Sequence, residues 1–185
     1  DKPTAVFVKH NNPCGVASAD SIEEAFKNGH QVDPLSAFGC IIAVNREVTN
    51  EILDYMKEEK MFVEVIIAPS YEEKALERLM TRKNLRILRT GDLKIDSLST
   101  DIKKVAGGIL IQTKDTDKLT KEELKVATEK KPTDEELDAM LFANTVCKHV
   151  KSNAVVMAKG TTVAAVGAGQ MSRVDSVYIA GQKGG

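Results

Sequence analysis

The 185-residue sequence has no tryptophan, and aromatic residues make up only 4% of it. It also lacks an excess of either charge, because 26 basic and 27 acidic residues leave a formal net charge of −1. A chain without a basic excess has little electrostatic attraction to nucleic acids or anionic membranes. No apolar run approaches the roughly 20 residues that a transmembrane helix needs. We therefore expect neither a nucleic-acid partner nor a membrane partner.

Cysteine is scarce, and Cys14, Cys40 and Cys147 lie far apart in the sequence. An odd, widely spaced set is typical of reduced thiols in a cytoplasmic protein rather than of a disulfide framework. Zinc sites need clustered cysteine and histidine ligands, whereas these residues are scattered singly. Pro13-Cys14 matches the first half of the P-C-x-x-C of zinc deaminases, but Ala17 stands where the second cysteine belongs. The sequence therefore predicts no metal site.

Strands and helices are predicted to alternate along the first half of the chain. Apolar β-branched runs predict strands, and capped amphipathic stretches predict helices. The expected elements are strands at 5–8, 40–44, 62–68 and 85–88 and helices at 22–28, from 50 onward and at 71–83. The runs around Ile41 and Ile66 are continuously apolar, as in strands buried on both faces. This alternation predicts an α/β layer fold with a mostly parallel or mixed sheet.

The second half is predicted to begin with a polar, irregular connection at 91–104 and a strand at 105–112. Thr133 and Glu136 then fit a capping box that opens the longest helix, 134–150. Its expected buried stripe consists of Leu137, Met140, Leu141 and Cys147. A hairpin and a glycine loop complete this half, with the hairpin strands expected at 154–158 and 162–166.

The stretch with the most reactive side chains is 9–15, Lys-His-Asn-Asn-Pro-Cys-Gly, which follows the first predicted strand. Lys9 and His10 can move protons or stabilise charge near neutral pH. Successive strand side chains point to opposite faces, so this pair can share a site only where the strand ends or kinks. We expect that break at Asn12-Pro13. Considered alone, such a pair is also common by chance, and a surface strand end is the plain alternative.

Three further features each have two interpretations. Glu64 lies in an apolar run, where a buried carboxylate needs a donor, although an edge-strand carboxylate facing water is the alternative. Asn153 either caps the preceding helix or faces a ligand. The glycine loop at 167–169 leads into a helix, whose N-terminus suits an anion. It matches neither GxGxxG nor a Walker motif, however, and a structural tight turn is the stronger alternative.

Five motifs, read in order, resemble those of AICAR transformylase. That enzyme is the folate-dependent half of a bifunctional purine-biosynthesis enzyme that also carries IMP cyclohydrolase. The motifs lie at 9–17, 33–39, 62–69, 152–156 and 167–174 and so span nearly the whole chain. The resemblance implies a cytidine-deaminase-like three-layer αβα fold without zinc. It also implies formyl transfer from 10-formyltetrahydrofolate to the 5-amino group of AICAR ribonucleotide.

The same resemblance implies roles for individual residues. His10 corresponds to the general base for an amine whose lone pair is delocalised into an imidazole ring, and Lys9 to its cationic partner. Asn153 corresponds to a residue that orients the amine and the formyl group. The implied substrate-binding residues are Asn12, Phe38, Gly39 and Glu64. The residues implied on the folate side are Gly169, Gln170, Arg173 and Val174.

The sequence also departs from the family pattern. Cys40 replaces the second glycine of the usual Phe-Gly-Gly, and Met157 replaces a common tyrosine. The family's transformylase continues into a second deaminase-like lobe, and its active site is shared across a homodimer. We therefore expect residues 1–185 to be a fragment of the transformylase domain, without the second lobe or the cyclohydrolase domain. A nucleotide-binding or oligomerisation module without activity of its own is the alternative.

Overall fold

The structure is a computed structural model that describes residues 2–92 and 100–184. Its strands are β1 (Thr4–Lys9), β2 (Asn12–Ser18), β3 (Cys40–Val44), β4 (Val63–Ala68), β5 (Arg86–Arg89), β6 (Thr100–Val105), β7 (Gly108–Thr113), β8 (Val155–Lys159) and β9 (Thr162–Gly167). Its helices are α1 (Ile22–Gln31), α2 (Asn50–Glu58), α3 (Glu73–Met80), α4 (Asp134–Cys147) and α5 (Arg173–Gly184), with a 3₁₀ turn at Lys121–Glu123. None of the described helices combines the length and the hydropathy that a membrane crossing requires.

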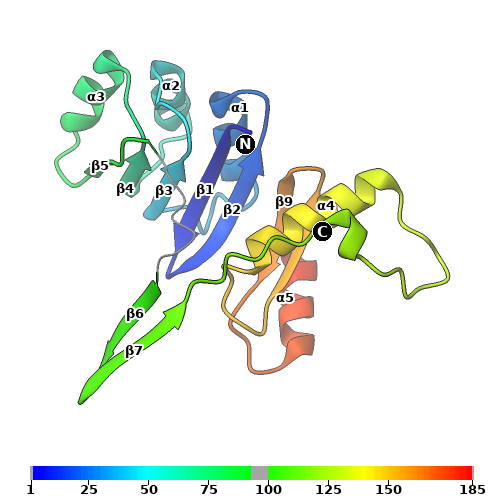
Figure 1. Cartoon of the computed structure of the whole chain (residues 1–185). Coiled ribbons are helices and arrows are strands. Elements are labelled where there is room, and N and C mark those ends of the chain that lie inside the picture. The colour runs from blue at the N-terminus through cyan, green and yellow to red at the C-terminus, as the bar shows by residue number, and fades with distance from the viewer. Residues whose placement is uncertain (1, 93–99, 185) are drawn as a thin grey trace.

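Seven strands form one mixed sheet in the order β5-β4-β3-β1-β2-β9-β8. The β3–β4 and β4–β5 pairs are parallel, and the other four neighbouring pairs are antiparallel. β6 and β7 pair separately as a two-stranded ribbon that projects from the rest of the fold (Figure 1). The predicted α/β class with a mixed sheet is confirmed, as is the β8–β9 hairpin.

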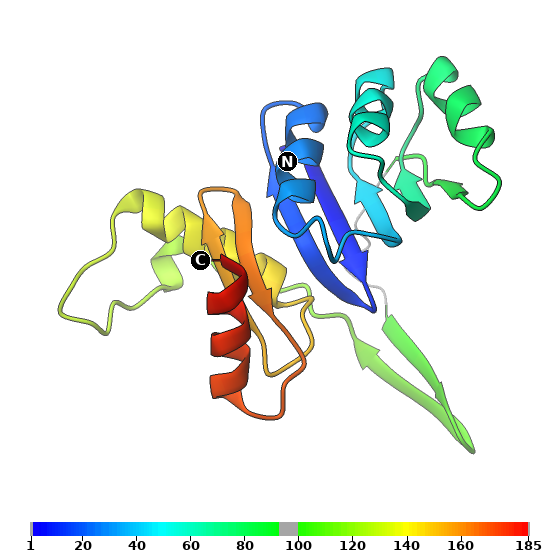
Figure 2. The same cartoon turned by 180° about the vertical axis from the view of Figure 1, so that it is seen from behind.

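Helices cover the two faces of the sheet unequally. Figures 1 and 2 show α1, α2, α3 and α5 on one face and α4 on the other. The main core lies under α1 to α3 and includes the buried side chains of Phe7, Phe26, Ile42, Met56, Ile66 and Leu79. A smaller core lies beside α4, around Val16, Val146, Val150 and Val163. Within the described residues, Ile41 remains 40% exposed, so burial of its strand on both faces was a wrong expectation.

Two glycines let α1 lie unusually close to the sheet. A Cβ built on Gly15 would overlap the carbonyl oxygen of Gly29, and one on Gly29 would lie 2.9 Å from the Phe7 ring. The helix was expected to end at residue 28, but α1 continues to Gln31, so Gly29 lies inside it. Glycine is needed at this position because α1 crosses the sheet closely, and not because the helix ends there. Ser21 is the N-cap of α1, because its Oγ accepts a hydrogen bond from Glu24 N at 3.1 Å.

The second half also departs from expectation. The capping box of Thr133 and Glu136 is confirmed, but α4 ends at Cys147. Its buried residue is Val146, whereas Met140, expected in the buried stripe, is 49% exposed. Part of the connection expected to be irregular is the strand β6, since its residues pair with β7. The rest of that connection, 93–99, lies outside the described residues.

Candidate active site

The site begins with a two-residue hairpin turn between β1 and β2. Lys9 pairs with Asn12, and the intervening His10 and Asn11 have φ angles of 50° and 63°. Two consecutive left-handed residues give a turn whose twist matches that of the flanking strands, and Asn and His tolerate this region better than most residues. The expected break at Asn12-Pro13 was therefore wrong by two residues. Pro13 instead lies in β2 beside a bulge, where its missing N–H is tolerated.

Lys9, the last residue of β1, is tied to the 33–39 loop. Its ammonium donates hydrogen bonds to the carbonyl oxygens of Phe38 and, at 3.3 Å, Gly39. Gly39 has a φ of 67°, and a Cβ there would lie 3.2 Å from Lys9 Nζ. The Phe38 ring packs on Phe62 at a centroid distance of 5.2 Å but stays 64% exposed. The loop thus holds the lysine and presents an open aromatic surface.

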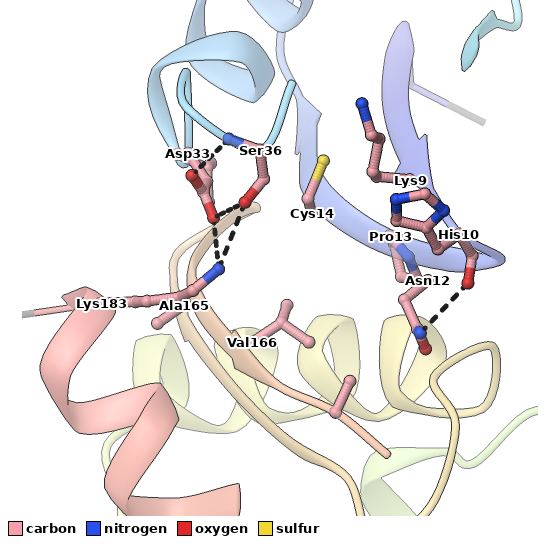
Figure 3. Close-up of a pocket in the computed structure, with 12 residues that line it drawn as sticks. Lys9, His10, Asn12, Pro13, Cys14, Asp33, Ser36, Ala165, Val166 and Lys183 are labelled. Carbon is pink, nitrogen blue, oxygen red and sulfur yellow. Dashed lines mark hydrogen bonds and ion pairs between the residues drawn. The ribbon is translucent and has the colours of Figure 1, made fainter. Parts of the chain in front are cut away.

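A pocket of about 230 Å³ lies beside this turn (Figure 3). Lys9, His10 and Asn12 line one side of it. Asp33, Ser36 and Lys183 lie together on another side, with Lys183 reaching in from the last turn of α5. The pocket therefore combines two predicted catalytic residues and one predicted substrate-binding residue with a polar cluster from distant elements.

The Asp33 carboxylate organises this polar cluster. It accepts hydrogen bonds from Lys183 Nζ at 2.6 Å, Ser36 Oγ at 2.7 Å and Ser36 N at 2.9 Å. Burial raises the pKa of Asp33, but the bonds from Lys183 and Ser36 outweigh burial and leave that pKa below its ordinary value. The carboxylate is therefore ionised at neutral pH.

Two cysteines near the site are poor nucleophiles. Burial, with a smaller contribution from the Asp33 charge, raises the pKa of the pocket residue Cys14 to about 11. Burial likewise raises the pKa of Cys40 to about 12. Because the thiolate is the reactive form, both thiols are unreactive at neutral pH.

Within residues 2–92 and 100–184, no group of three or more His, Cys, Asp or Glu side chains could hold a metal ion.

Asn153 lies against the loop that joins β9 to α5. Its Nδ2 donates to the carbonyl oxygens of Gln170 and Met171 at 2.9 and 3.0 Å, and its backbone N–H donates to Gln170 O at 3.0 Å. The side chain therefore bonds to this loop and does not cap the preceding helix. With both amide hydrogens engaged, the chemistry left to the side chain is acceptance of a hydrogen bond at Oδ1.

The glycines of this loop have structural reasons to be glycine. A Cβ at Gly167 would overlap the carbonyl oxygen of Ser176, so Gly167 allows α5 to pack on β9. Gly169 has a φ of 70°, which favours glycine. The tight-turn interpretation therefore accounts for both glycines. Arg173 begins α5 and is exposed, and Val174 is 73% exposed.

Glu64 does not line this pocket. It occupies the irregularity of the β3–β4 register, between the residues that pair with Cys40 and Ile41. Its side chain is exposed and lies 3.9 Å from Arg86 of β5. The carboxylate faces solvent, as the plainer interpretation held, although β4 is not an edge strand.

The strand directions bring the five motifs to one end of the sheet. That end holds the C-termini of β1 and β9 and the N-termini of β2, β3, β4 and β8. A short hydrogen-bonded path also connects the turn to the glycine loop. Asn12 Oδ1 accepts from Lys151 N at 2.9 Å, and Lys151 O accepts from Gly169 N at 2.7 Å.

Comparison with known proteins identifies the family. The model of a family described as AICARFT/IMPCHase bienzyme matches residues 1–183. The chain belongs to this family. Among curated relatives, the bifunctional purine biosynthesis protein PurH of Acetivibrio thermocellus is 48% identical over 100% of this chain and 36% of its own length. Proteins of the same name from Caldicellulosiruptor saccharolyticus and Caldicellulosiruptor bescii are 47% and 46% identical over 96% of this chain and 34% of their lengths.

The chain spans about a third of the length of these AICARFT/IMPCHase relatives.

The polar cluster of Asp33, Ser36 and Lys183 was not predicted from the sequence. Asp-x-x-Ser is a local signal for a side-chain turn and could have indicated the first two. Lys183 has no such signal, because it lies 150 residues from Asp33 and meets it only through the fold.

Proposed function

We propose that this AICARFT/IMPCHase chain acts in purine biosynthesis as part of a formyl-transfer site. The reaction passes a formyl group from 10-formyltetrahydrofolate to the 5-amino group of AICAR ribonucleotide. The observation that carries the proposal is the pocket of about 230 Å³ lined by Lys9, His10 and Asn12. Further support comes from the gathering of the five motifs at the same end of the sheet.

His10 serves as the general base. The amine of AICAR is a weak nucleophile, so its proton must leave as its nitrogen attacks the formyl carbon. His10 is exposed on a two-residue turn beside the pocket, where a bound amine can reach it. The new bond joins the amine nitrogen to the formyl carbon, and the bond from that carbon to the folate nitrogen breaks. The departing folate nitrogen takes up a proton.

Lys9 stabilises the negative charge that develops on the formyl oxygen. An ammonium group has three hydrogens to donate, and the carbonyls of Phe38 and Gly39 accept two of them. The third remains for the oxyanion or for proton delivery to the folate nitrogen. Because two backbone carbonyls hold the ammonium in advance, little reorganisation is needed when charge develops.

The other residues bind and orient the two substrates. Asn153 Oδ1 accepts a hydrogen bond from the amine, since its Nδ2 already donates to the loop carbonyls. Phe38 packs against the AICAR heterocycle beside Gly39, with Asn12 at the turn and Glu64 near the carboxamide. Gly169, Gln170, Arg173 and Val174 face the folate.

The assembly proposed for the site is larger than this chain. We assign it a cytidine-deaminase-like αβα arrangement, supported by helices on both faces of the mixed sheet. The active site is completed by a second lobe and by a second subunit of a homodimer, so residues 1–185 alone turn over little or nothing. We also propose a cytoplasmic location, supported by the free thiols of Cys14, Cys40 and Cys147.

The test is a His10→Asn variant of the whole enzyme that carries this chain. Asparagine tolerates the left-handed turn but cannot act as a base, so the fold is retained while the chemistry is removed. We expect formyl transfer, followed spectroscopically, to fall roughly 10²–10⁴-fold. Calorimetric AICAR affinity should change little, and cyclisation of formyl-AICAR to IMP in the same preparation should be unaffected. Wild-type transfer by this variant, or equal loss of both activities, contradicts the proposal.

A further inference from the structure

The 33–39 loop is held at both of its ends by lysine side chains from other elements. At one end, Lys183 Nζ lies 2.6 Å from Asp33 Oδ2 and 3.3 Å from Ser36 Oγ. At the other end, Lys9 donates to the carbonyls of Phe38 and Gly39. Figure 3 shows Lys183 and Lys9 on opposite sides of the pocket.

The contact at Asp33 has the features of a structural pair rather than of a loose surface pair. The Asp33 side chain is only 15% exposed, whereas that of Lys183 is 44% exposed, and Ser36 donates to Asp33 twice. Exposed ion pairs contribute little because water screens them. A carboxylate this shielded is costly to leave without its cation, so loss of Lys183 should loosen the loop.

Lys183 is itself attached firmly to the sheet. It lies in the last turn of α5, and this helix packs closely on β9 where Gly167 meets the Ser176 carbonyl. At the far end of the loop, Gly39 N donates to Phe62 O at 2.8 Å. Asp33 is thus the point at which α5 can set the conformation of the loop.

We propose that Lys183 is a positioning residue: by holding Asp33, it sets the loop whose carbonyl oxygens direct the Lys9 ammonium. This inference rests on the proposed formyl transfer, because it concerns the same site. Lys183 does not act on the reacting atoms. It determines how well Lys9 is placed, and misplacement by about 1 Å can cost roughly 100-fold in rate.

The experiment compares variants of the whole enzyme at two readouts, the formyl-transfer rate and amide exchange of the 33–39 segment. Lys183→Met should lower kcat roughly tenfold to 100-fold and speed exchange at Ser36 and Gly39. Lys183→Arg keeps the positive charge and should keep most of the kcat and most of the amide protection of the wild type. Lys27→Met removes a lysine that pairs with Glu51 at 3.2 Å, away from the pocket, and should change neither.

Several outcomes overturn the inference. Unchanged exchange in Lys183→Met shows that the pair does not hold the loop. Faster exchange with unchanged kcat shows that the loop does not position Lys9. A fall in kcat that Lys183→Arg leaves uncorrected, with global unfolding, shows a general folding defect. Failure of the proposed reaction is seen separately, as wild-type transfer by His10→Asn, whereas the exchange result does not depend on activity.

Discussion

Asn12 and Lys151 are 139 residues apart in sequence, yet Asn12 Oδ1 accepts a hydrogen bond from Lys151 N at 2.9 Å. The bond joins the turn that carries His10 to the segment that enters β8. Lys151 O in turn accepts from Gly169 N, so the turn and the glycine loop share one connection. The two halves of the proposed site, for AICAR and for folate, are therefore linked through the Asn12 side chain and the backbone of Lys151.

Replacing Asn12 tests this link. Asn12→Ala leaves the Lys151 amide without its acceptor, which should cost about 1 kcal/mol locally, or roughly fivefold in amide protection. Asn12→Asp retains an acceptor oxygen and should keep the protection. The measurement is hydrogen exchange at Lys151 and Gly169. Equal protection in all three proteins would mean that the bond does not couple the segments.

Gly39→Ala should impair formyl transfer beyond its effect on stability. An alanine at a φ of 67° costs about 1–2 kcal/mol, and its Cβ would lie 3.2 Å from Lys9 Nζ. Gly160→Ala is the matched control, because Gly160 has a φ of 55° and no neighbour within 4 Å. Thermal melting should show similar losses for both variants, while only Gly39→Ala should slow transfer. Equal transfer rates would contradict the proposed placement of Lys9.

Gly15→Ala should destabilise the fold by about 1–3 kcal/mol or more, because the clash with the Gly29 carbonyl can be relieved only by moving α1. Gly181→Ala provides a control of opposite sign. Gly181 lies inside α5 with open space around its Cα, so alanine should stabilise the helix by up to about 1 kcal/mol. Urea denaturation measures both effects. A neutral Gly15→Ala would show that α1 can shift freely.

His30 should make stability depend on pH. It lies buried in α1 with Nδ1 2.9 Å from the Tyr55 hydroxyl. Burial lowers the His30 pKa below its ordinary value of 6.5, with the Glu59 charge acting in the opposite direction. Below about pH 6.5 the unfolded chain binds a proton that the folded chain does not, so stability falls as the pH decreases toward the folded pKa.

The measurement for His30 is the melting temperature at about pH 7.5 and pH 5.5, on either side of the ordinary histidine pKa. Wild type should lose more stability over this interval than His30→Gln, which has no titrating group there. Tyr55→Phe keeps the buried imidazole and should keep the pH dependence. Parallel pH profiles for wild type and His30→Gln would exclude His30 as the source.

Features that depend on neighbouring residues were predicted from the sequence, whereas features that depend on contacts between distant residues were not. The capping box at Thr133 and the apolar runs of β3 and β4 are local signals, and the structure contains the helix and the strands. The turn was misplaced because Pro13 is a strong local breaker, whereas pairing of β1 with β2 puts the break at His10 and Asn11. Likewise, the close packing of α1 on the sheet requires a glycine at position 29, inside a helix that was expected to end at residue 28.

The candidate site divides in the same way. The residues carried by motifs came from the sequence, and chain direction brings them to one end of the sheet. The contacts that constrain them could not be predicted, since Lys183–Asp33 and Lys151–Asn12 each join segments more than 100 residues apart. Hydrophobic periodicity also cannot reveal that Met140 lies on the exposed side of α4, because the choice depends on what covers the sheet there.

The projecting β6–β7 ribbon has a consequence for handling the protein. In the described structure each of its strands pairs only with the other, so both outer edges expose hydrogen-bonding groups. Ile109, Leu110 and Ile111 are each about 60% exposed on β7. Open edges with apolar β-branched side chains favour strand addition between molecules, and the neighbouring Lys103 and Lys104 oppose it by charge. Aggregation of the isolated chain should therefore begin at this ribbon, and high salt, which screens the lysines, should accelerate it.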